Sequence, residues 1–455
     1  MALEQRVLEH VIPHLDSESL ARGCMTCSSW RAMCSDDRLW QECALEDFGL
    51  TLAARPPIGG GRACGTFKEA WMAWRGEFRD FYTSPEDASI LKRAARCWHT
   101  IQAFLAVNGP EIGESLNEGV TREKLRQFEE ETKLELPLAV KAIYRIHNGQ
   151  DNAHVPIDFD LDRGPANWRG IFGGYSFYDT VVNIRMLSLD RAVFLLQKLQ
   201  RHAADVAAER PAFLQDAFPF ACSVMGTLLR DPAKSLLVNV RDGNVYTIAP
   251  HQTDMEEARR CCPEAGPSAH KDGMLRWMED YAARLREGHH IVTKFIRDID
   301  DAVGISLFPM RQPGYSEAIT RGVRIRASAI YVPEMCHGDG ESRYFFTYSM
   351  RMKFLERYGA MTSCQLISRH FVFSKWDEIR GETKDRVNGE AVIGLHPYLE
   401  VGGEEFVYQS CTPMPGPKGS MEGHFRFVPG SLEKPEGPPF DVRMGLLNFA
   451  VPDYF

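Results

Sequence analysis

The chain has 455 residues, of which 44% are hydrophobic and 25% charged, a composition typical of globular protein and a length that predicts about three domains. The net charge of -9 and the pI near 5.9 argue against a general binder of nucleic acid or of anionic membranes. No apolar run reaches the roughly 18 residues that a membrane span needs, and the N-terminus is too mixed for a secretory signal.

The first 48 residues are patterned as short helices. A first helix is expected to carry Leu8 to Leu15 on one apolar face over two turns. Asp16 and Ser17 can cap a second helix, and Ser35 and Asp36 can cap a third. The apolar positions expected on the three helices are Leu8, Val11, Ile12 and Leu15, then Leu20, Cys24 and Cys27, then Leu39, Trp40 and Cys43. A unit this small cannot bury two tryptophans alone, so another part of the chain or a partner should cover some of its apolar surface.

A Pro/Gly-rich loop follows, and then a helix with Phe67, Trp71, Trp74 and Phe78 on one side. That much aromatic surface should pack under the N-terminal helices. The Ser84-Pro85 pair marks a candidate boundary.

The N-terminal pattern resembles the F-box, whose signature combines a leading Leu, a helix with paired aliphatic residues, a Cys-x-x-Trp-like element and Asp-x-x-Leu-Trp. The matching residues are Leu3, Val7-Leu8, Val11-Ile12, Leu15, Leu20, Cys27 to Trp30, and Asp36 to Trp40. The sequence departs from the family at Glu4, where Pro is usual, and at Pro13, which should end or kink the first helix. An ordinary helical hairpin is the alternative, and the two tryptophans with the SDDRLW ending favour the F-box.

This resemblance implies that the chain docks on a Skp adaptor and, through it, on a cullin. The expected contact residues are Leu3, Val7, Leu8, Val11, Ile12, Leu15, Leu20, Trp30, Leu39 and Trp40.

Residues 85–295 mix helices and strands. Helices are predicted over residues 90–107 and 123–132, and a third should begin near Pro137, bury Val140 and Ile143, and stop at Asn148-Gly149. SLLVNVRDGNVYTI reads as a hairpin, and GMLRWMEDYAARLREG as a closing helix after a CCPEAGPSAHKDG loop. This region resembles the SUKH (Smi/Knr) superfamily. The resemblance depends on LPLAVKAIYRIHNG, followed in order by IFGGYSFYDT, the hairpin and the closing helix.

From about residue 296 onward, apolar residues alternate with polar ones, as antiparallel strands over a shared core require. The alternating runs are 323–331, 344–354 and 421–427, and the short strands with Gly/Pro turns suggest a β-sandwich. Four segments of this region resemble the ApaG domain, a fibronectin-type-III-like sandwich. They are SRYFFTYSMRMKF, QLISRHFVF, VNGEAVIGLHPYLEVGGEEFVYQSC and TPMPGPKGSMEGHFRFV.

The predicted fold class is therefore multidomain α+β. The expected parts are an F-box at 1–48, a linker and packing helix at 49–84, a SUKH α/β domain at 85–295 and an ApaG sandwich at 296–455.

Candidate chemistry is sparse. Cys24-x-x-Cys27, with Cys34 and Cys43 nearby, could suggest zinc, but no second ligand pair follows at finger spacing, so core cysteines are expected. Cys261-Cys262 is expected to be a loop pair and His147 a core histidine. We find no P-loop, no His-Glu-x-x-His and no Gly-x-Ser-x-Gly, and we expect no metal, cofactor or catalytic residue.

The GPKGSMEG segment could let backbone donors and Lys418 approach a phosphate. The simpler interpretation is a hairpin connection between strands, because two prolines remove donors that a phosphate cradle would need. Arg369 and His370 alternate to opposite faces, and an Arg among inward apolar residues suggests a bulge or a buried ion pair.

These resemblances together imply a non-catalytic substrate-recognition subunit of a Skp–cullin–F-box ubiquitin ligase, whose target protein the sequence does not name. The 12 scattered cysteines fit a reducing compartment, so cytosol or nucleus is expected. Two loops that carry Glu334, Asp339, Glu341 and Lys418 are the candidate target-binding segments, and the alternative is that both are solvated connectors between strands. A small-ligand sensor acting through the sandwich and a hydrolytic enzyme are the competing hypotheses.

Overall fold

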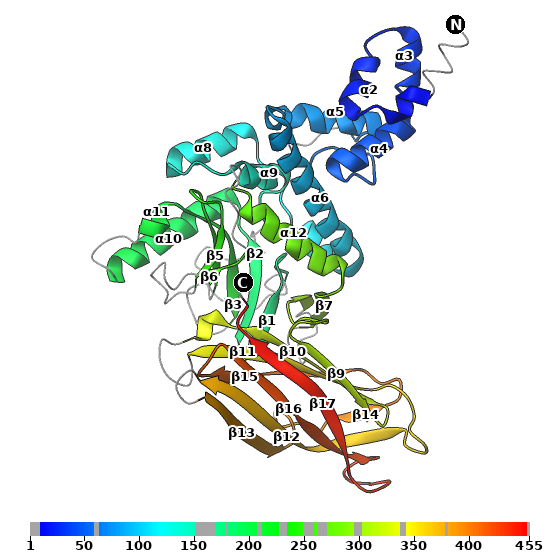
Figure 1. Cartoon of the computed structure of the whole chain (residues 1–455), viewed down its shortest axis with the longest axis vertical. Helices are drawn as coiled ribbons and strands as arrows, with labels where there is room; N and C mark the ends of the chain where they lie inside the picture. Colours follow the sequence, from blue (N-terminus) through cyan, green and yellow to red (C-terminus); the bar gives the residue numbers. More distant parts are fainter. Residues whose placement is uncertain are drawn as a thin grey trace.

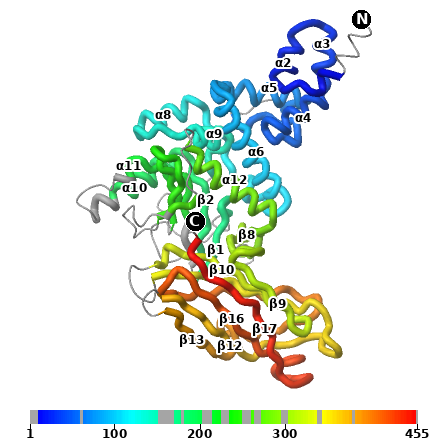
Figure 2. Tube along the Cα trace, in the orientation of Figure 1, coloured from blue at the N-terminus to red at the C-terminus, as the bar shows by residue number. Residues whose placement is uncertain are grey.

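The computed structural model describes residues 10–58, 63–150, 169–177, 180–206, 212–226, 234–248, 259–262, 271–294, 303–336, 343–377 and 381–452. Three parts follow one another along the long axis of the molecule: N-terminal helices, a central α/β part and a β-sandwich (Figure 1). The last strand returns from the far end of the sandwich toward the central part (Figure 2).

The N-terminal part contains η1 (Ile12–His14), α2 (Ser17–Gly23), α3 (Ser28–Met33), α4 (Asp37–Phe48) and α5 (Phe67–Glu77). Of the predicted caps, the two aspartates are confirmed: Asp16 accepts from the Ser19 N–H at 2.7 Å and Asp36 from the Arg38 N–H at 3.1 Å. Ser17 and Ser35 do not cap these helices; they bond to Asp47 and Lys68 instead. Pro13 lies in η1, after which the backbone at Leu15 is extended, so the predicted end of the first helix near Pro13 is confirmed. The expectation that Leu15 belongs to that helix is wrong, because the helix ends before it.

The single second helix expected through Leu20, Cys24 and Cys27 is wrong. The helix ends at Gly23, whose carbonyl accepts a hydrogen bond from the Thr26 hydroxyl at 2.8 Å, and α3 begins after the turn. Cys24 remains buried, whereas Cys27 occupies the N-cap position of α3 without a side-chain hydrogen bond and is exposed. The turn thus removes Cys27 from the apolar face that helical spacing predicted.

The α5 helix packs against α4, as its aromatic spacing predicted. The rings of Trp40 and Trp71 lie 5.1 Å apart and those of Phe48 and Trp74 lie 5.2 Å apart. One hydrophobic core extends from these helices into the central part, while a second fills the sandwich.

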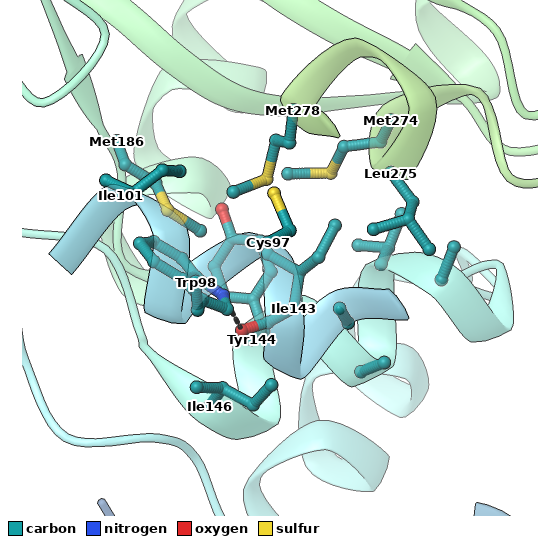
Figure 3. Packing of buried hydrophobic residues seen from close by; sticks show 14 of the residues in the cluster. Cys97, Trp98, Ile101, Ile143, Tyr144, Ile146, Met186, Met274, Leu275 and Met278 are labelled. Carbon is teal, nitrogen blue, oxygen red and sulfur yellow. Dashed lines mark hydrogen bonds between the residues drawn. The ribbon is translucent and has the colours of Figure 1, made fainter. Parts of the chain in front are cut away.

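The helices of the central part are α6 (Pro85–Asn108), α7 (Pro110–Glu114), α8 (Arg122–Thr132), α9 (Leu138–Ile146), α10 (Leu189–Val206), α11 (Ala212–Gln215) and α12 (Gly273–Arg286), with η2 (Arg79–Phe81) before them. The α6, α9 and α12 helices pack together, and Trp98 donates to the Ile143 carbonyl at 3.2 Å (Figure 3). Gly149 has the predicted left-handed conformation, with φ of +69°, after α9.

Eight strands of the described chain form the central sheet in the order β6-β5-β4-β3-β2-β1-β8-β7. Their bounds are β1 (Gly174–Phe177), β2 (Thr180–Met186), β3 (Ala217–Gly226), β4 (Ser235–Asn239), β5 (Val245–Ile248), β6 (Arg259–Arg260), β7 (Ile291–Lys294) and β8 (Val303–Ser306). The β4–β5 hairpin confirms the expected turn, in which Gly243 has φ of +75°. Most of the expected CCPEAGPSAHKDG loop lies outside the described residues.

The sandwich packs the sheet β15-β11-β10-β9 against the sheet β13-β12-β16-β17, with β14 paired to β12. The strands are β9 (Tyr315–Thr320), β10 (Val323–Tyr331), β11 (Tyr344–Phe354), β12 (Ser363–Asp377), β13 (Gly381–Glu390), β14 (Tyr398–Glu400), β15 (Phe406–Met414), β16 (Lys418–Pro429) and β17 (Phe440–Ala450), with η4 (Pro333–Met335) after β10. The alternating runs of the sequence therefore predicted the antiparallel strands correctly.

The sandwich begins later than residue 296. The β8 strand follows that position but pairs with β7 and β1 of the central sheet, and the first sandwich strand starts at Tyr315. The polar face of β11 is also buried: Thr347 donates to the Ser176 carbonyl at 2.7 Å, and Arg351 lies 3.6 Å from Glu405. The central part covers this face near Thr347, which is why alternation alone did not reveal its burial. No helix in the described segments is long and apolar enough to cross a membrane.

Candidate functional site

A buried carboxylate joins the N-terminal helices to the rest of the molecule. Asp47 on α4 accepts hydrogen bonds from the Ser17 hydroxyl at 2.6 Å and from Trp71 Nε1 at 2.8 Å. Lys92 Nζ on α6 lies 2.6 Å from the other carboxylate oxygen. Three donors on α2, α5 and α6 thus converge on one carboxylate, as burying a carboxylate requires.

A second carboxylate fixes the start of α5. Asp37 accepts from the backbone N–H groups of Phe67 and Lys68 at 3.2 and 3.1 Å, so it serves the otherwise unpaired donors of that helix N-terminus. The Lys68 ammonium donates to the hydroxyl of Ser35, in the turn between α3 and α4, at 2.8 Å.

Some of the predicted Skp-contact residues are buried in the chain's own core, and others are exposed. Ile12, Leu20 and Trp40 are buried in the chain's own core, and Trp40 Nε1 donates to the Cys34 carbonyl at 2.7 Å. Trp40 is thus not an exposed contact as expected, because α5 covers its ring. Other predicted contacts keep exposed or partly exposed side chains, namely Val11, Leu15, Trp30 and Leu39. Leu3, Val7 and Leu8 lie outside the described residues.

Two arginines form ion pairs that connect α5 and η2 to the central part and link α6 to α12 within it. Arg145 on α9 is fully buried, and its guanidinium lies 2.7 Å from the Glu77 carboxylate and 3.3 Å from that of Asp80. Arg93 on α6 lies 2.6 Å from Glu279 on α12 and 2.7 Å from Asp272. Together with the continuous hydrophobic core and the Asp47–Lys92 pair, the Arg145 contacts hold the N-terminal helices in a defined orientation on the central part.

A buried polar cluster lies where the central sheet meets the sandwich. The Tyr175 hydroxyl donates to the Glu334 carboxylate at 2.5 Å, and the Lys234 ammonium donates to the Tyr175 hydroxyl at 2.8 Å. Lys234 and Glu334 are 3.4 Å apart. Burial lowers the pKa of Lys234 from its ordinary value, and the Glu334 carboxylate acts in the opposite direction.

Glu334 is therefore not the exposed, target-reading carboxylate that its loop position suggested. Its side chain is only 4% exposed, because Lys234, a hundred residues earlier in the chain, provides a buried counter-charge. Asp339 and Glu341 lie outside the described residues. Lys418 is exposed at the start of β16.

The GPKG turn does not form the expected hairpin. It connects β15 of one sheet to β16 of the other and so crosses from sheet to sheet. The backbone passes close to β12 here, since a Cβ on Gly416 would lie 1.8 Å from the Trp376 carbonyl oxygen. Glycine at this position is explained by that approach.

The predicted alternation places Arg369 and His370 on opposite faces. His370 stacks on His424 with ring centroids 5.0 Å apart, while Arg369 donates to the carbonyls of Glu390 and Ala391. The pairing register between β12 and β16 shifts between Leu366 and Ser368, so the predicted bulge is confirmed. Arg369 has no carboxylate partner within the described segments, so the alternative of an ion pair is wrong.

The remaining candidates from the sequence are mainly core residues. His147 is buried, its two ring nitrogens lie 2.9 Å from the Asn117 carbonyl and 3.0 Å from Gln102 Nε2, and burial lowers its pKa to about 4. Cys261 and Cys262 are also buried. Burial raises the pKa of Cys43 to about 11 and that of Cys222 to about 12, so these thiols stay protonated near neutral pH. In the described part of the chain, no group of three or more His, Cys, Asp or Glu side chains is placed to hold a metal ion.

Comparison with known proteins gives the same division of the chain at its two ends. A family model described as F-box-like matches residues 5–46, and one described as the ApaG domain matches residues 336–429. F-box protein SKIP16 of Arabidopsis thaliana is 31% identical over 464 residues, which cover 98% of each chain. F-box only protein 3 of Homo sapiens is 23% identical over 360 residues, 78% of this chain and 66% of that protein. Protein ApaG of Methylobacterium sp. (strain 4-46) is 32% identical over 137 residues, 30% of this chain and 93% of that protein.

Proposed function

The chain belongs to the F-box proteins that carry a C-terminal ApaG domain, and from this premise we propose that it is the substrate-recognition subunit of a Skp–cullin–F-box ubiquitin ligase. The F-box docks on Skp, and the central part and the sandwich bind the protein to be ubiquitinated. The chain contributes binding and positioning, while the covalent chemistry belongs to other subunits.

The observation that carries this proposal is the apolar surface that the F-box leaves uncovered. Val11 is 43% exposed, and Leu15, Trp30 and Leu39 are only partly covered although α5 packs against the same helices. Uncovered apolar side chains on a rigidly held unit are typical of a protein-docking surface. These four residues, with Leu3, Val7 and Leu8, form the proposed Skp contact.

The contacts around Asp47 and Arg145 support a positioning role. A substrate-recognition subunit must present its target at a fixed distance from the site of ubiquitin transfer, and a flexible joint would lower the effective concentration of the target there. The pairing of Asp47 in the F-box with Lys92 on α6, and of Glu77 on α5 with the buried Arg145 on α9, suits that requirement.

We also propose that the central part is a SUKH domain, with the F-box at 1–48, a packing segment at 49–84 and the sandwich from about residue 309. The α9 helix ending in Asn148-Gly149 and the β4–β5 hairpin support this assignment. An experimental structure in which these elements do not share one sheet-containing core would contradict it.

A cytosolic or nuclear location is part of the proposal. All 12 cysteines have free thiols, which suits a reducing compartment. Imaging of a fluorescently tagged chain checks this, and accumulation in the secretory pathway would contradict it.

The Skp interaction is tested by co-purification. A tagged chain expressed in cultured cells should recover Skp and cullin, and Trp30→Ala should reduce that recovery, because truncating an aromatic contact residue typically costs about 2 kcal/mol or more of binding. Failure of the wild-type chain to recover Skp would refute the proposal.

A further inference from the structure

One side of the sandwich is open and contains a pocket. The strands β13 and β15 are the edge strands of the two sheets on that side (Figure 1). A cavity of about 250 Å³ lies between them, lined by residues of β11 and β15 from one sheet and β12 and β13 from the other. Neither edge pairs with a further strand of the described chain.

The walls of the pocket are aromatic. Tyr348 and Tyr408 line it from one sheet, and Phe371 and Phe373 from the other. All four side chains are buried, whereas Val387 and Ile393, which also line the pocket, are 38% and 53% exposed. The pocket thus combines an aromatic interior with exposed aliphatic surface.

The pocket also carries a net positive charge. Lys375 and Asp385 line it and neutralise each other, since Lys375 Nζ lies 2.8 Å from the Asp385 carboxylate. The Arg369 guanidinium donates only to the backbone carbonyls of Glu390 and Ala391 within the described chain. Among the described residues, no carboxylate pairs with this charge, which favours an anionic ligand.

The Tyr408 hydroxyl, which also lines the pocket, lacks a hydrogen-bond partner in the described part of the chain. The Tyr408 side chain is only 4% exposed, and its hydroxyl forms no hydrogen bond with the residues described. A buried hydroxyl without a partner is costly, and a ligand that accepts or donates a hydrogen bond there would remove that cost.

We propose that this pocket binds an acidic side chain, Asp or Glu, presented by an extended segment of the target protein. The acid pairs with Arg369 and Tyr408, while an apolar neighbour covers Val387 and Ile393. The unpaired backbone groups along β13 and β15 favour an extended peptide, because free sheet edges pair with added strands. This inference rests on the proposed function as a substrate-recognition subunit.

Selection of peptides on the immobilised full chain tests the inference. A display library of random 12-residue peptides is the probe, and the selected peptides are synthesised and their Kd values measured. We expect them to share an Asp or Glu next to an aliphatic or aromatic residue. Replacing that acid by its amide should weaken binding about tenfold or more, as expected for loss of a charge-assisted hydrogen bond.

Variants of the chain assign the effect to the pocket. Arg369→Gln should weaken binding of the acidic peptide about tenfold or more and should have little further effect on the amide peptide. Arg386→Gln makes the same change at an exposed residue of β13 outside the pocket lining, and its Kd should stay within about twofold of wild type. Tyr408→Phe should weaken binding without lowering Tm, because it removes a hydroxyl that has no partner.

Several results would overturn the inference. They are selected peptides without an acid, equal losses in Arg369→Gln and Arg386→Gln, unchanged binding in Tyr408→Phe, or binding only after the peptide is phosphorylated. Skp binding is measured on the same proteins and should be unchanged in all three variants. A wild-type chain that binds the peptide but not Skp would refute the proposed function and leave the pocket assignment intact.

Discussion

Replacing Asp47 by alanine should loosen the F-box from the rest of the chain. The Asp47 carboxylate is the hydrogen-bond acceptor that the Ser17 hydroxyl and Trp71 Nε1 share, and it also contacts the Lys92 ammonium. Ser17 is 8% exposed and Trp71 only 2%, so neither donor has ready access to water once the carboxylate is gone. The α2 helix loses its polar attachment to α4 and, through it, to α5.

The expected magnitude follows from these contacts. A buried donor left without a partner costs about 1–3 kcal/mol, so the two donors together give roughly 2–6 kcal/mol. Lys92 adds little, because its side chain is 35% exposed and can be solvated by water. The lower figure of about 2 kcal/mol already corresponds to a roughly 30-fold change in a local opening equilibrium.

Hydrogen–deuterium exchange of the full chain measures this effect. The amides of α2 in the Asp47→Ala variant should exchange at least about 30-fold faster than in wild type, while the sandwich strands stay unchanged. Glu46→Ala is the matched control, since Glu46 is an exposed neighbour and its removal should cost within about 0.5 kcal/mol. Acceleration of α2 by less than about threefold in Asp47→Ala would refute the role assigned to the carboxylate.

Three further predictions follow from buried charge, histidine burial and the separate sandwich core. Glu334→Gln should destabilise the junction between the central sheet and the sandwich by roughly 3 kcal/mol, because it removes the carboxylate beside the buried Lys234. An unfolding midpoint equal to that of wild type would contradict this prediction. Burial lowers the folded-state pKa of His147 to about 4, below its unfolded value of about 6.5. Between these pH values the unfolded state binds more protons than the folded state, so stability should fall as the pH drops from about 6.5 to 4. His147→Gln should reduce the pH dependence of Tm in that window, and part should remain because burial also lowers the pKa of His99 and of His290. The same change at the exposed His14 should leave the dependence intact, and equal slopes in both variants would contradict the assignment. A fragment of residues 309–455 should fold alone with a circular dichroism spectrum of sheet, and a strongly helical spectrum from the folded fragment would contradict the separate core.

Local signals in the sequence predicted the elements well. The caps at Asp16 and Asp36, the stop at Asn148-Gly149 and the alternating strands depend on residues close in the chain, and the structure confirms them. The missed features depend on distant partners. Helical spacing shows that Trp40 lies on an apolar face, but it does not show which partner covers that face. The sequence therefore suggests a contact with Skp, whereas Trp71 of α5 covers the Trp40 ring.

The candidate target-binding residues show the same limit. Glu334 is in a loop with acidic neighbours and was expected to be exposed, but Lys234 and Tyr175 approach it from the central sheet. The pocket brings residues of four strands together, and no short stretch of sequence contains them. One signal was present: Arg369 interrupts an apolar face of its strand, and that irregularity coincides with the pocket.

The central claim is that the F-box surface binds Skp, and the most direct test is the Kd of purified Skp for the purified chain. Val11→Glu changes a proposed contact that is 43% exposed, and Met72→Glu makes the same kind of change at a 41% exposed methionine on α5, outside the proposed contact. We predict tight binding by wild type, a loss of about tenfold or more in Val11→Glu, and a Kd within about twofold of wild type in Met72→Glu. No binding by the wild-type chain, or equal losses in the two variants, would contradict the account.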